Sequence, residues 1–392
     1  MKITALETLH ADAGWYTISF VKLSTDEGLV GWSEYRTDAG NAGLTAVIEG
    51  LGRLLVGADP RQIEQIDALL RARTRQAPGG LNSQAVAALL NALFDVKAHA
   101  LGVPVSALFG GQVRTRIPLY WSHCGSYRLR HAQVLGVEPV RTLDDIVRLG
   151  AEVRQRGFGA LKASILLDDQ GQLRSFGPGF GWSPGFPELN VDRQVLQSVD
   201  QLLAAFREGA GNDVMLMLDA NCHFRPEGAW QIARAVAPHD LTWLEIDLPE
   251  PAALAAVRRA GHCPVASCEA VYGRRALRSY LDQQAVDVAI IDVNWNGFLE
   301  AVKMASLADS YDVNVATHSY GGCLGECISA QFAAAVPNLR IMEIDVDHVP
   351  WAREFVTHPP VIEDGVLVLS DRPGWGTGIN EEAVRAYPPA RR

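Results

Sequence analysis

The chain has 392 residues, of which 48% are hydrophobic, and its formal net charge is −10. Acidic and basic residues are spread throughout, so neither nucleic acid nor an anionic membrane is expected as a main partner. No signal segment follows the first residue, no apolar stretch approaches the length of a membrane span, and the six cysteines do not form a disulfide framework. We therefore expect a cytoplasmic protein.

The start of the chain combines β-structure with a helix. Two alternating apolar runs, 16–23 and 29–35, are separated by a turn sequence and predict a β-hairpin. A helix is expected from Ser83, as its N-cap, to Ala100, because glycine and proline end the periodic stretch there. We interpret residues 1–115 as an α+β domain.

Short apolar runs then alternate with helical stretches. The runs IPLYWS and GALKASILL come first, a helix with one apolar stripe is expected at 192–208, and RIMEID (340–345) is the last run. About eight strands follow one another in this way, which predicts an α/β fold with a parallel (β/α) barrel over residues 116–358. Hairpin character returns at 361–370.

Two segments interrupt the regular spacing. Residues 124–145 follow the first strand, and residues 168–191, which are rich in glycine, proline and aromatic residues, follow the second. Loops that leave the carboxyl ends of barrel strands lie on the active face. Each segment is either an ordered surface insertion or part of a lid or substrate wall.

Polar residues recur at almost one interval, each at the end of a short apolar run. Asp219, Glu245, Glu269, Asp292 and His318 are separated by 26, 24, 23 and 26 residues. A strand with its crossover helix needs about 25 residues or slightly more, so these side chains should meet at one mouth of the barrel. Three carboxylates so close together require a cation, and all-oxygen ligands suit Mg²⁺.

This order, with Lys162 on the preceding strand, resembles the mandelate racemase branch of the enolase superfamily. The sequences DEGLVGWSEY, 92–111 and 373–380 are similar to that family's cap hairpin, cap helix and C-terminal return to the cap. The resemblance covers nearly the whole chain. It implies a modified (β/α)7β barrel under an α+β cap that both termini build, with residues 359–392 as the C-terminal part.

The resemblance also implies a chemistry, which is removal of a proton α to a carboxylate to give a metal-stabilised enediolate. Asp219, Glu245 and Glu269 would hold Mg²⁺, which lowers the cost of the second negative charge. His318 would be the acid–base group, and Asp292 would orient its imidazole and favour the protonated form. One such carboxylate alone would more simply be a helix cap, but three in register favour the metal.

Further polar residues are candidate contacts to the substrate. Glu343 matches the family's glutamate on the last strand and would either donate a hydrogen bond to the substrate carboxylate or help to position it. Asn221 is a substrate contact or a turn residue, and His223 enters the mouth or is an ordinary loop histidine. Asp247 stands where the family commonly has proline and is a candidate extra polar contact.

The second strand departs from the family's Lys-x-Lys motif. Lys162 and Ser164 share one face of the strand, but serine is a poor base without an activating partner, so a racemase with two opposed bases is disfavoured. Ser164 remains a candidate substrate contact. Lys162 would stabilise the enolate oxygen, act as a base if desolvation lowers its pKa, or bridge the metal carboxylates.

We therefore predict a lyase, a Mg²⁺-dependent dehydratase of an aldonic or aldaric acid. One acid–base pair can remove the α-proton and then protonate the departing β-hydroxyl, which yields a 2-keto-3-deoxy acid. The alternatives are a racemase, epimerase or cycloisomerase of a hydroxy or sugar acid, and a metal-binding pseudoenzyme with a sensing role. The family implies a small-molecule carboxylate substrate and a homo-oligomer, from dimer to octamer.

Overall fold

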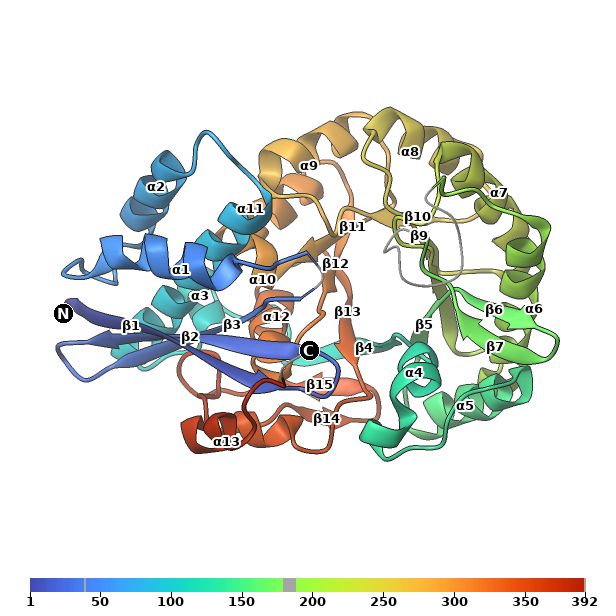
Figure 1. Ribbon diagram of the computed structural model, residues 1–392. Helices are drawn as coiled ribbons and strands as arrows, with labels where there is room; N and C mark the ends of the chain where they lie inside the picture. Colours follow the sequence, from blue (N-terminus) through green and yellow to red (C-terminus); the bar gives the residue numbers. More distant parts are fainter. Residues whose placement is uncertain (39, 179–187, 391–392) are drawn as a thin grey trace.

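Antiparallel strands at the start of the chain form the sheet of the cap, as the alternating runs predict. The structure, a computed structural model, describes residues 1–38, 40–178 and 188–390. The central strand of this sheet pairs with both others, and helices pack against it. These elements, blue to cyan in Figure 1, are β1 (Ile3–Asp12), β2 (Thr17–Thr25), β3 (Val30–Arg36), α1 (Leu44–Gly52), α2 (Ile63–Arg73) and α3 (Gly80–Leu101).

Helix α3 begins earlier than the sequence predicts. Its N-cap is Gly79 and Ser83 lies in the first turn, so the prediction of Ser83 as N-cap is wrong. The additional first turn, residues 80–83, is not fully buried and contains glycine and asparagine, which are weak helix formers, so the sequence places the start of the helix too late. The predicted end is confirmed, because Gly102 caps the helix in the left-handed conformation.

Eight parallel strands close into a barrel within the described residues, because the last strand pairs with the first. They are β4 (Arg116–Ser122), β5 (Ala160–Ser164), β8 (Met215–Asp219), β9 (Trp243–Glu245), β10 (Val265–Ser267), β11 (Val288–Asp292), β12 (Asn314–His318) and β13 (Leu339–Asp345). The longer helices between them include α5 (Leu143–Gln155), α6 (Arg193–Ala210), α7 (Pro226–Val236), α8 (Pro251–Arg259), α9 (Gly273–Asp282), α11 (Phe298–Asp309) and α12 (Cys323–Ala335). The predicted α/β barrel with a cap is thus confirmed.

The two interrupting segments contain secondary structure of their own. The first holds α4 (Ser126–Leu135), and the chain after β5 forms the hairpin β6 (Leu166–Asp169) and β7 (Gln172–Ser175). The run GALKASILL is therefore not one strand, because the chain leaves the barrel after Ser164. Part of the expected lid or wall at 168–191 lies outside the described residues.

The C-terminal part of the chain touches both barrel and cap. The predicted hairpin is confirmed as β14 (Val361–Glu363) and β15 (Val366–Val368), and β15 extends the barrel sheet by pairing with β4. Helix α13 (Glu381–Ala386) then packs against β1. Between these elements, the indole of Trp375 donates to the carbonyl of Trp32 at 2.9 Å, and its backbone N–H donates to Asp95 at 3.0 Å. Among the described residues, no helix is long and apolar enough to cross a membrane.

The barrel interior is filled by one apolar layer, which is separate from the larger core between strands and helices. Side chains of a strand alternate between its two faces. On each strand, the next side chain that points into the barrel therefore belongs to the residue two positions after the member of the apolar layer. That position is polar on seven of the strands. The layer includes Tyr120, Ala160, Met217, Trp243, Ile290, Ala316 and Ile341, and the polar positions are Ser122, Lys162, Asp219, Glu245, Asp292, His318 and Glu343.

Candidate active site

The candidate metal ligands lie at the carboxyl ends of neighbouring strands. Asp219 ends β8, Glu245 ends β9, and the two residues are register partners. Glu269 follows β10 by two residues and reaches the mouth through an irregular backbone, because Cys268 has a φ of 94°. Non-glycine residues rarely take this conformation, and where they do the site is often functional.

Lys162 lies among the carboxylates at the floor of the mouth. Its Nζ is 3.1 Å from Asp219, 2.8 Å from Glu245 and 3.1 Å from Glu343, and the side chain is only 2% exposed. Burial lowers the pKa of Lys162, but the surrounding carboxylates outweigh burial, so the pKa lies well above its usual value. In this arrangement Lys162 is a bridging cation.

The three candidate ligands fit a divalent cation. Within the described residues, no group of three acidic, histidine or cysteine side chains is already arranged to hold a metal ion. Instead, the ammonium of Lys162 contacts two of the candidate ligands, Asp219 and Glu245. However, Oε1 of Glu245 is buried and has no hydrogen-bond partner, and burial raises the pKa of Glu245 to about 8. An all-oxygen set of this kind suits Mg²⁺, so Asp219, Glu245 and Glu269 are the residues that would hold it.

His318 and Asp292 form a buried pair beside these carboxylates. Nδ1 of His318 lies 2.5 Å from Oδ2 of Asp292, and Nε2 lies 3.5 Å from Glu269. Asp292 also accepts a hydrogen bond from the backbone N–H of Trp295 at 2.7 Å, which fixes its orientation. Burial lowers the pKa of His318, but Glu269 and Asp292 outweigh it and hold the pKa well above its usual value. The imidazole is thus oriented, with Nε2 toward the candidate metal ligands.

Glu343 is held from both sides. Ser122 Oγ donates to one carboxylate oxygen at 2.5 Å, and the backbone N–H of Ser319 donates to the other at 2.6 Å. Burial raises the pKa of Glu343, but the charges of Lys162 and His318 outweigh it, so the pKa lies below its usual value. Of the two roles considered for Glu343, its ionised form favours positioning over donation of a hydrogen bond.

The remaining predicted substrate contacts, Asn221, Ser164 and His223, have different surroundings. Asn221 has a φ of 47° and donates to Asp219 Oδ1 from both its backbone and its side chain at 2.8 Å, so it orients a candidate ligand. Ser164 is the register partner of Asp219 and is half-buried. His223 is buried against Phe176, and burial lowers its pKa to about 4.

Several mouth residues were not predicted. His123 follows β4 directly, and its Nδ1 lies 2.7 Å from Asp345, which ends β13. His123 lies just beyond the end of β4 and Asp345 ends β13, but the apolar runs do not show which of several polar residues at a strand end reach the mouth. From the cap side, Arg36 lies between the rings of Tyr16 and Tyr320, at 3.7 and 3.6 Å from their centroids. No sequence signal indicates that contact, because it joins the cap to a barrel loop.

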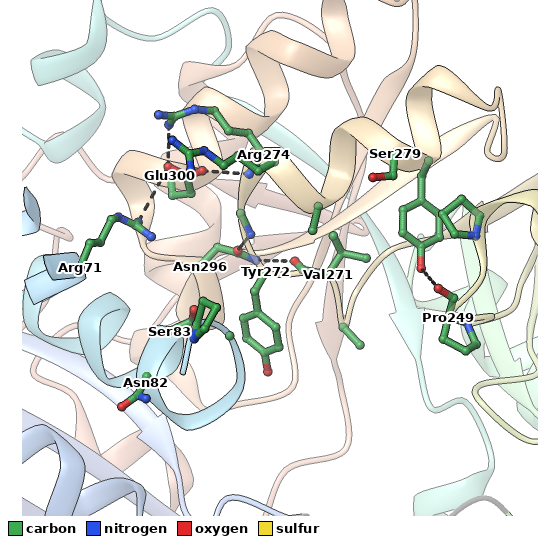
Figure 2. Close-up of a pocket in the computed structure, with 18 of the residues that line it drawn as sticks. Arg71, Asn82, Ser83, Pro249, Val271, Tyr272, Arg274, Ser279, Asn296 and Glu300 are labelled. Carbon is green, nitrogen blue, oxygen red and sulfur yellow. Dashed lines mark hydrogen bonds and ion pairs between the residues drawn. The ribbon is translucent and has the colours of Figure 1, made fainter. Parts of the chain in front are cut away.

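A cavity of about 1620 Å³ opens between the cap and the loops after β9 and β10. Figure 2 shows its wall, where Arg71 from the cap and Arg274 from the barrel both contact Glu300, at 3.8 and 2.7 Å. Cys222 and Asp247, which follow the ends of β8 and β9, line the same cavity. The cavity thus approaches the strand ends, although none of the three candidate ligands lines it.

The fold and the ring of strand-end groups define an enzyme of the enolase type. The chain matches the model of the enolase C-terminal domain-like family over residues 145–383, and that of the mandelate racemase/muconate lactonizing enzyme N-terminal domain over residues 4–110. The protein belongs to the mandelate racemase/muconate lactonizing enzyme family of the enolase superfamily.

Similar proteins differ in the reaction that their names state. D-galactarolactone cycloisomerase from Agrobacterium fabrum is 31% identical over 94% of this chain and 90% of its own. D-xylonate dehydratase from Haloferax volcanii is 27% identical over 98% and 89%. A crystal structure from Burkholderia xenovorans, of a provisionally named L-alanine-DL-glutamate epimerase, was solved with magnesium and fumarate. It is 47% identical with a TM-score of 0.97, and it covers 99% of this chain and 96% of its own.

Proposed function

We propose that the protein is a Mg²⁺-dependent dehydratase of a sugar acid. The observation that carries this proposal is the buried His318–Asp292 pair, whose Nε2 lies 3.5 Å from Glu269. A hydroxy acid whose carboxylate joins the metal set would bring its α-proton within reach of this nitrogen. The position on β5 where the family carries a second lysine is Ser164, so a lysine-to-histidine proton transfer has no support here.

Each residue then has a defined task. Asp219, Glu245 and Glu269 would hold Mg²⁺, which supplies positive charge against the negative charge that develops on the substrate carboxylate. A cation held by Glu269 would offset the carboxylate charge that contributes most to raising the His318 pKa, so the neutral imidazole would then take the α-proton while Asp292 keeps it oriented. Lys162 contributes a fixed positive charge beneath the reacting carboxylate, and its contact with three carboxylates argues against a role as base.

The substrate class is supported by the relatives and by the mouth. The names of several relatives state dehydration of sugar acids, among them D-xylonate and D-galactonate. Polar groups also surround the mouth beyond the candidate ligands, including Asn221 and Asp247, which can bind hydroxyl groups of a sugar acid. The loss of water would yield a 2-keto-3-deoxy acid.

A second candidate is an epimerase. The 47% identical protein carries an epimerase name, and an epimerase needs an acid–base group on each face of the α-carbon. His318 would be one of them, and the second would have to come from a residue other than Ser164. This alternative predicts exchange of the α-proton with no loss of water.

The test is a library of sugar and hydroxy acids incubated with the enzyme and Mg²⁺ in D₂O. We expect a 2-keto acid, detected by carbonyl trapping, from one or a few members, and none when the metal is chelated. Deuterium at the α-carbon without any keto acid would favour the epimerase. Silence across the library, with Mg²⁺ binding confirmed by calorimetry, would contradict both proposals and favour a binding protein.

A further inference from the structure

A second histidine–carboxylate pair lies at the barrel mouth. His123 follows β4 directly, and its Nδ1 is 2.7 Å from Oδ1 of Asp345 at the end of β13. The pair is built like His318–Asp292, because each pair joins two adjacent parallel strands at their carboxyl ends. In both, the carboxylate binds Nδ1, which leaves Nε2 as the nitrogen that can exchange a proton with a reactant.

The two imidazoles flank one carboxylate. Glu343 lies on β13, between β12 and β4 in the strand order. Ser122, which precedes His123, donates to one oxygen of Glu343, and Ser319, which follows His318, donates to the other. Both histidines therefore belong to the same site, on opposite sides of a residue that is a candidate contact to the substrate.

His123 is held in place and yet remains accessible. Its ring stacks on Tyr127 with centroids 4.7 Å apart and lies 5.4 Å from Tyr320, while the side chain is 20% exposed. Its φ is 48°, a conformation that non-glycine residues rarely adopt, and Ser126 stabilises it with two hydrogen bonds to the His123 carbonyl. Asp345 is 5% exposed and also accepts a hydrogen bond from Tyr127 at 3.4 Å.

We propose that His123, oriented by Asp345, is the second acid–base group of this active site and protonates the leaving β-hydroxyl. The inference rests on the proposed dehydration. His318 takes the α-proton, and the electron pair of the broken C–H bond becomes the new carbon–carbon double bond. The β-carbon–oxygen bond breaks, its electron pair stays on oxygen, and the proton from His123 completes a water molecule.

The number of protons on the two histidines is restored after each turnover. The enol product takes a proton at the former β-carbon and becomes the 2-keto acid, while its hydroxyl proton is released. His318 ends with one proton more and His123 with one fewer, and exchange with solvent restores both. Because the acid and the base are separate groups, the leaving hydroxyl does not have to lie on the face from which His318 removes the proton.

The test separates proton removal from elimination. His123→Asn is incubated in D₂O with Mg²⁺ and the acid that the wild-type enzyme converts. We expect keto-acid formation to fall at least about 100-fold, while deuterium exchange at the α-carbon, followed by NMR in recovered substrate, changes only a few-fold. Equal losses of exchange and elimination, or no loss of either, would overturn the proposal.

Two further variants exclude a merely structural role. Tyr127→Phe removes a hydrogen bond to the same Asp345 but keeps the stacked ring, and it should retain the wild-type ratio of elimination to exchange. If it matches His123→Asn, the pair is structural. His123→Gly suits the left-handed backbone, and added imidazole should restore elimination to it; absence of rescue in a folded variant counts against the proposal.

The two proposals can fail separately. Wild-type enzyme that forms no keto acid from any acid overturns both. Wild-type enzyme that forms keto acid, together with His123→Asn that keeps the wild-type ratio, overturns only the role of His123.

Discussion

The two halves of the barrel mouth use the same strand-end positions but satisfy their charges differently. On β8 and β9, Asp219 and Glu245 share the single ammonium of Lys162, and one oxygen of Glu245 has no partner. At the ends of β12 and β4, His318 and His123 each pair with a carboxylate, at 2.5 and 2.7 Å. The acidic half is therefore suited to gain a cation, whereas the histidine half is already organised for proton transfer.

Removal of His318 should produce the largest loss and leave the acidic half intact. For His318→Asn we expect α-proton exchange to fall about 1000-fold, because the variant has no group that takes the proton, while Mg²⁺ affinity changes little. NMR in D₂O and calorimetry measure the two effects. His239→Asn is the matched control, since His239 pairs with Asp200 at 2.8 Å after α7, away from the strand ends. Exchange that survives in His318→Asn would contradict the assignment.

The histidine half is tied to the cap through Glu34. This carboxylate accepts hydrogen bonds from the backbone N–H groups of Gly322 and Gly325, in the loop and helix that follow His318. A Cβ at either glycine would come within 3.2 Å of the carboxylate, so the two glycines form a close-fitting cradle. Burial raises the pKa of Glu34 from 4.5 to about 7, against these hydrogen bonds.

This shift predicts a pH dependence of stability. The folded protein binds a proton at Glu34 more tightly than the unfolded chain, so the contribution is complete below pH 4.5 and is lost as the pH rises to about 7. In Glu34→Gln this fall, about 3 kcal/mol, should be absent from the free energy of unfolding. Urea unfolding of both proteins across this range measures it. Parallel pH curves for the two proteins would show that Glu34 does not titrate as described.

The acidic half should respond to the loss of one ligand. Glu245→Gln is expected to weaken Mg²⁺ binding by more than about 100-fold, because even residues that only orient metal ligands are worth 10- to 100-fold. Isothermal calorimetry gives the affinity. Glu363→Gln is the control, since that side chain is 57% exposed and pairs with Arg116. Unchanged Mg²⁺ affinity in Glu245→Gln would remove Glu245 from the ligand set.

The smallest effect is expected at Asn221. Asn221→Gly keeps the left-handed backbone but loses the side-chain hydrogen bond to Asp219, so Mg²⁺ affinity should fall about 10-fold. Asn221→Ala should lose the same affinity and, in addition, about 1 kcal/mol of stability from backbone strain. If Asn221→Gly binds Mg²⁺ like the wild type, the side chain does not orient the ligand.

The acidic half was predictable because the chain is regular there. One helix and one strand separate each of Asp219, Glu245, Glu269 and Asp292 from the next, so sequence spacing reports position around the mouth. The interval between Lys162 and Asp219 is longer, because the β6–β7 hairpin lies between their strands. The apolar run GALKASILL continues past the end of β5, because Leu166 and Leu167 are buried in the β6–β7 hairpin outside the barrel sheet.

The second histidine pair was missed for a different reason. His123 lies one residue beyond the end of β4. Asp345 lies two residues after Glu343 on β13, and Glu343 is the residue of that strand that the sequence predicts to be functional. Apolar runs mark the buried part of a strand, but they do not tell which of several polar residues at its end reach the mouth. Contacts across closed strands, such as β13 with β4, follow from barrel closure and not from local sequence.

A crystal structure with Mg²⁺ and the hydroxy acid identified in the library would show whether the acidic half holds the metal and His318 faces the α-carbon. We expect Mg²⁺ with oxygen ligands from Asp219, Glu245 and Glu269 at about 2.0–2.1 Å. We also expect the α-carbon about 3–3.5 Å from Nε2 of His318. A metal bound elsewhere, or an α-carbon turned away from His318, would contradict these assignments.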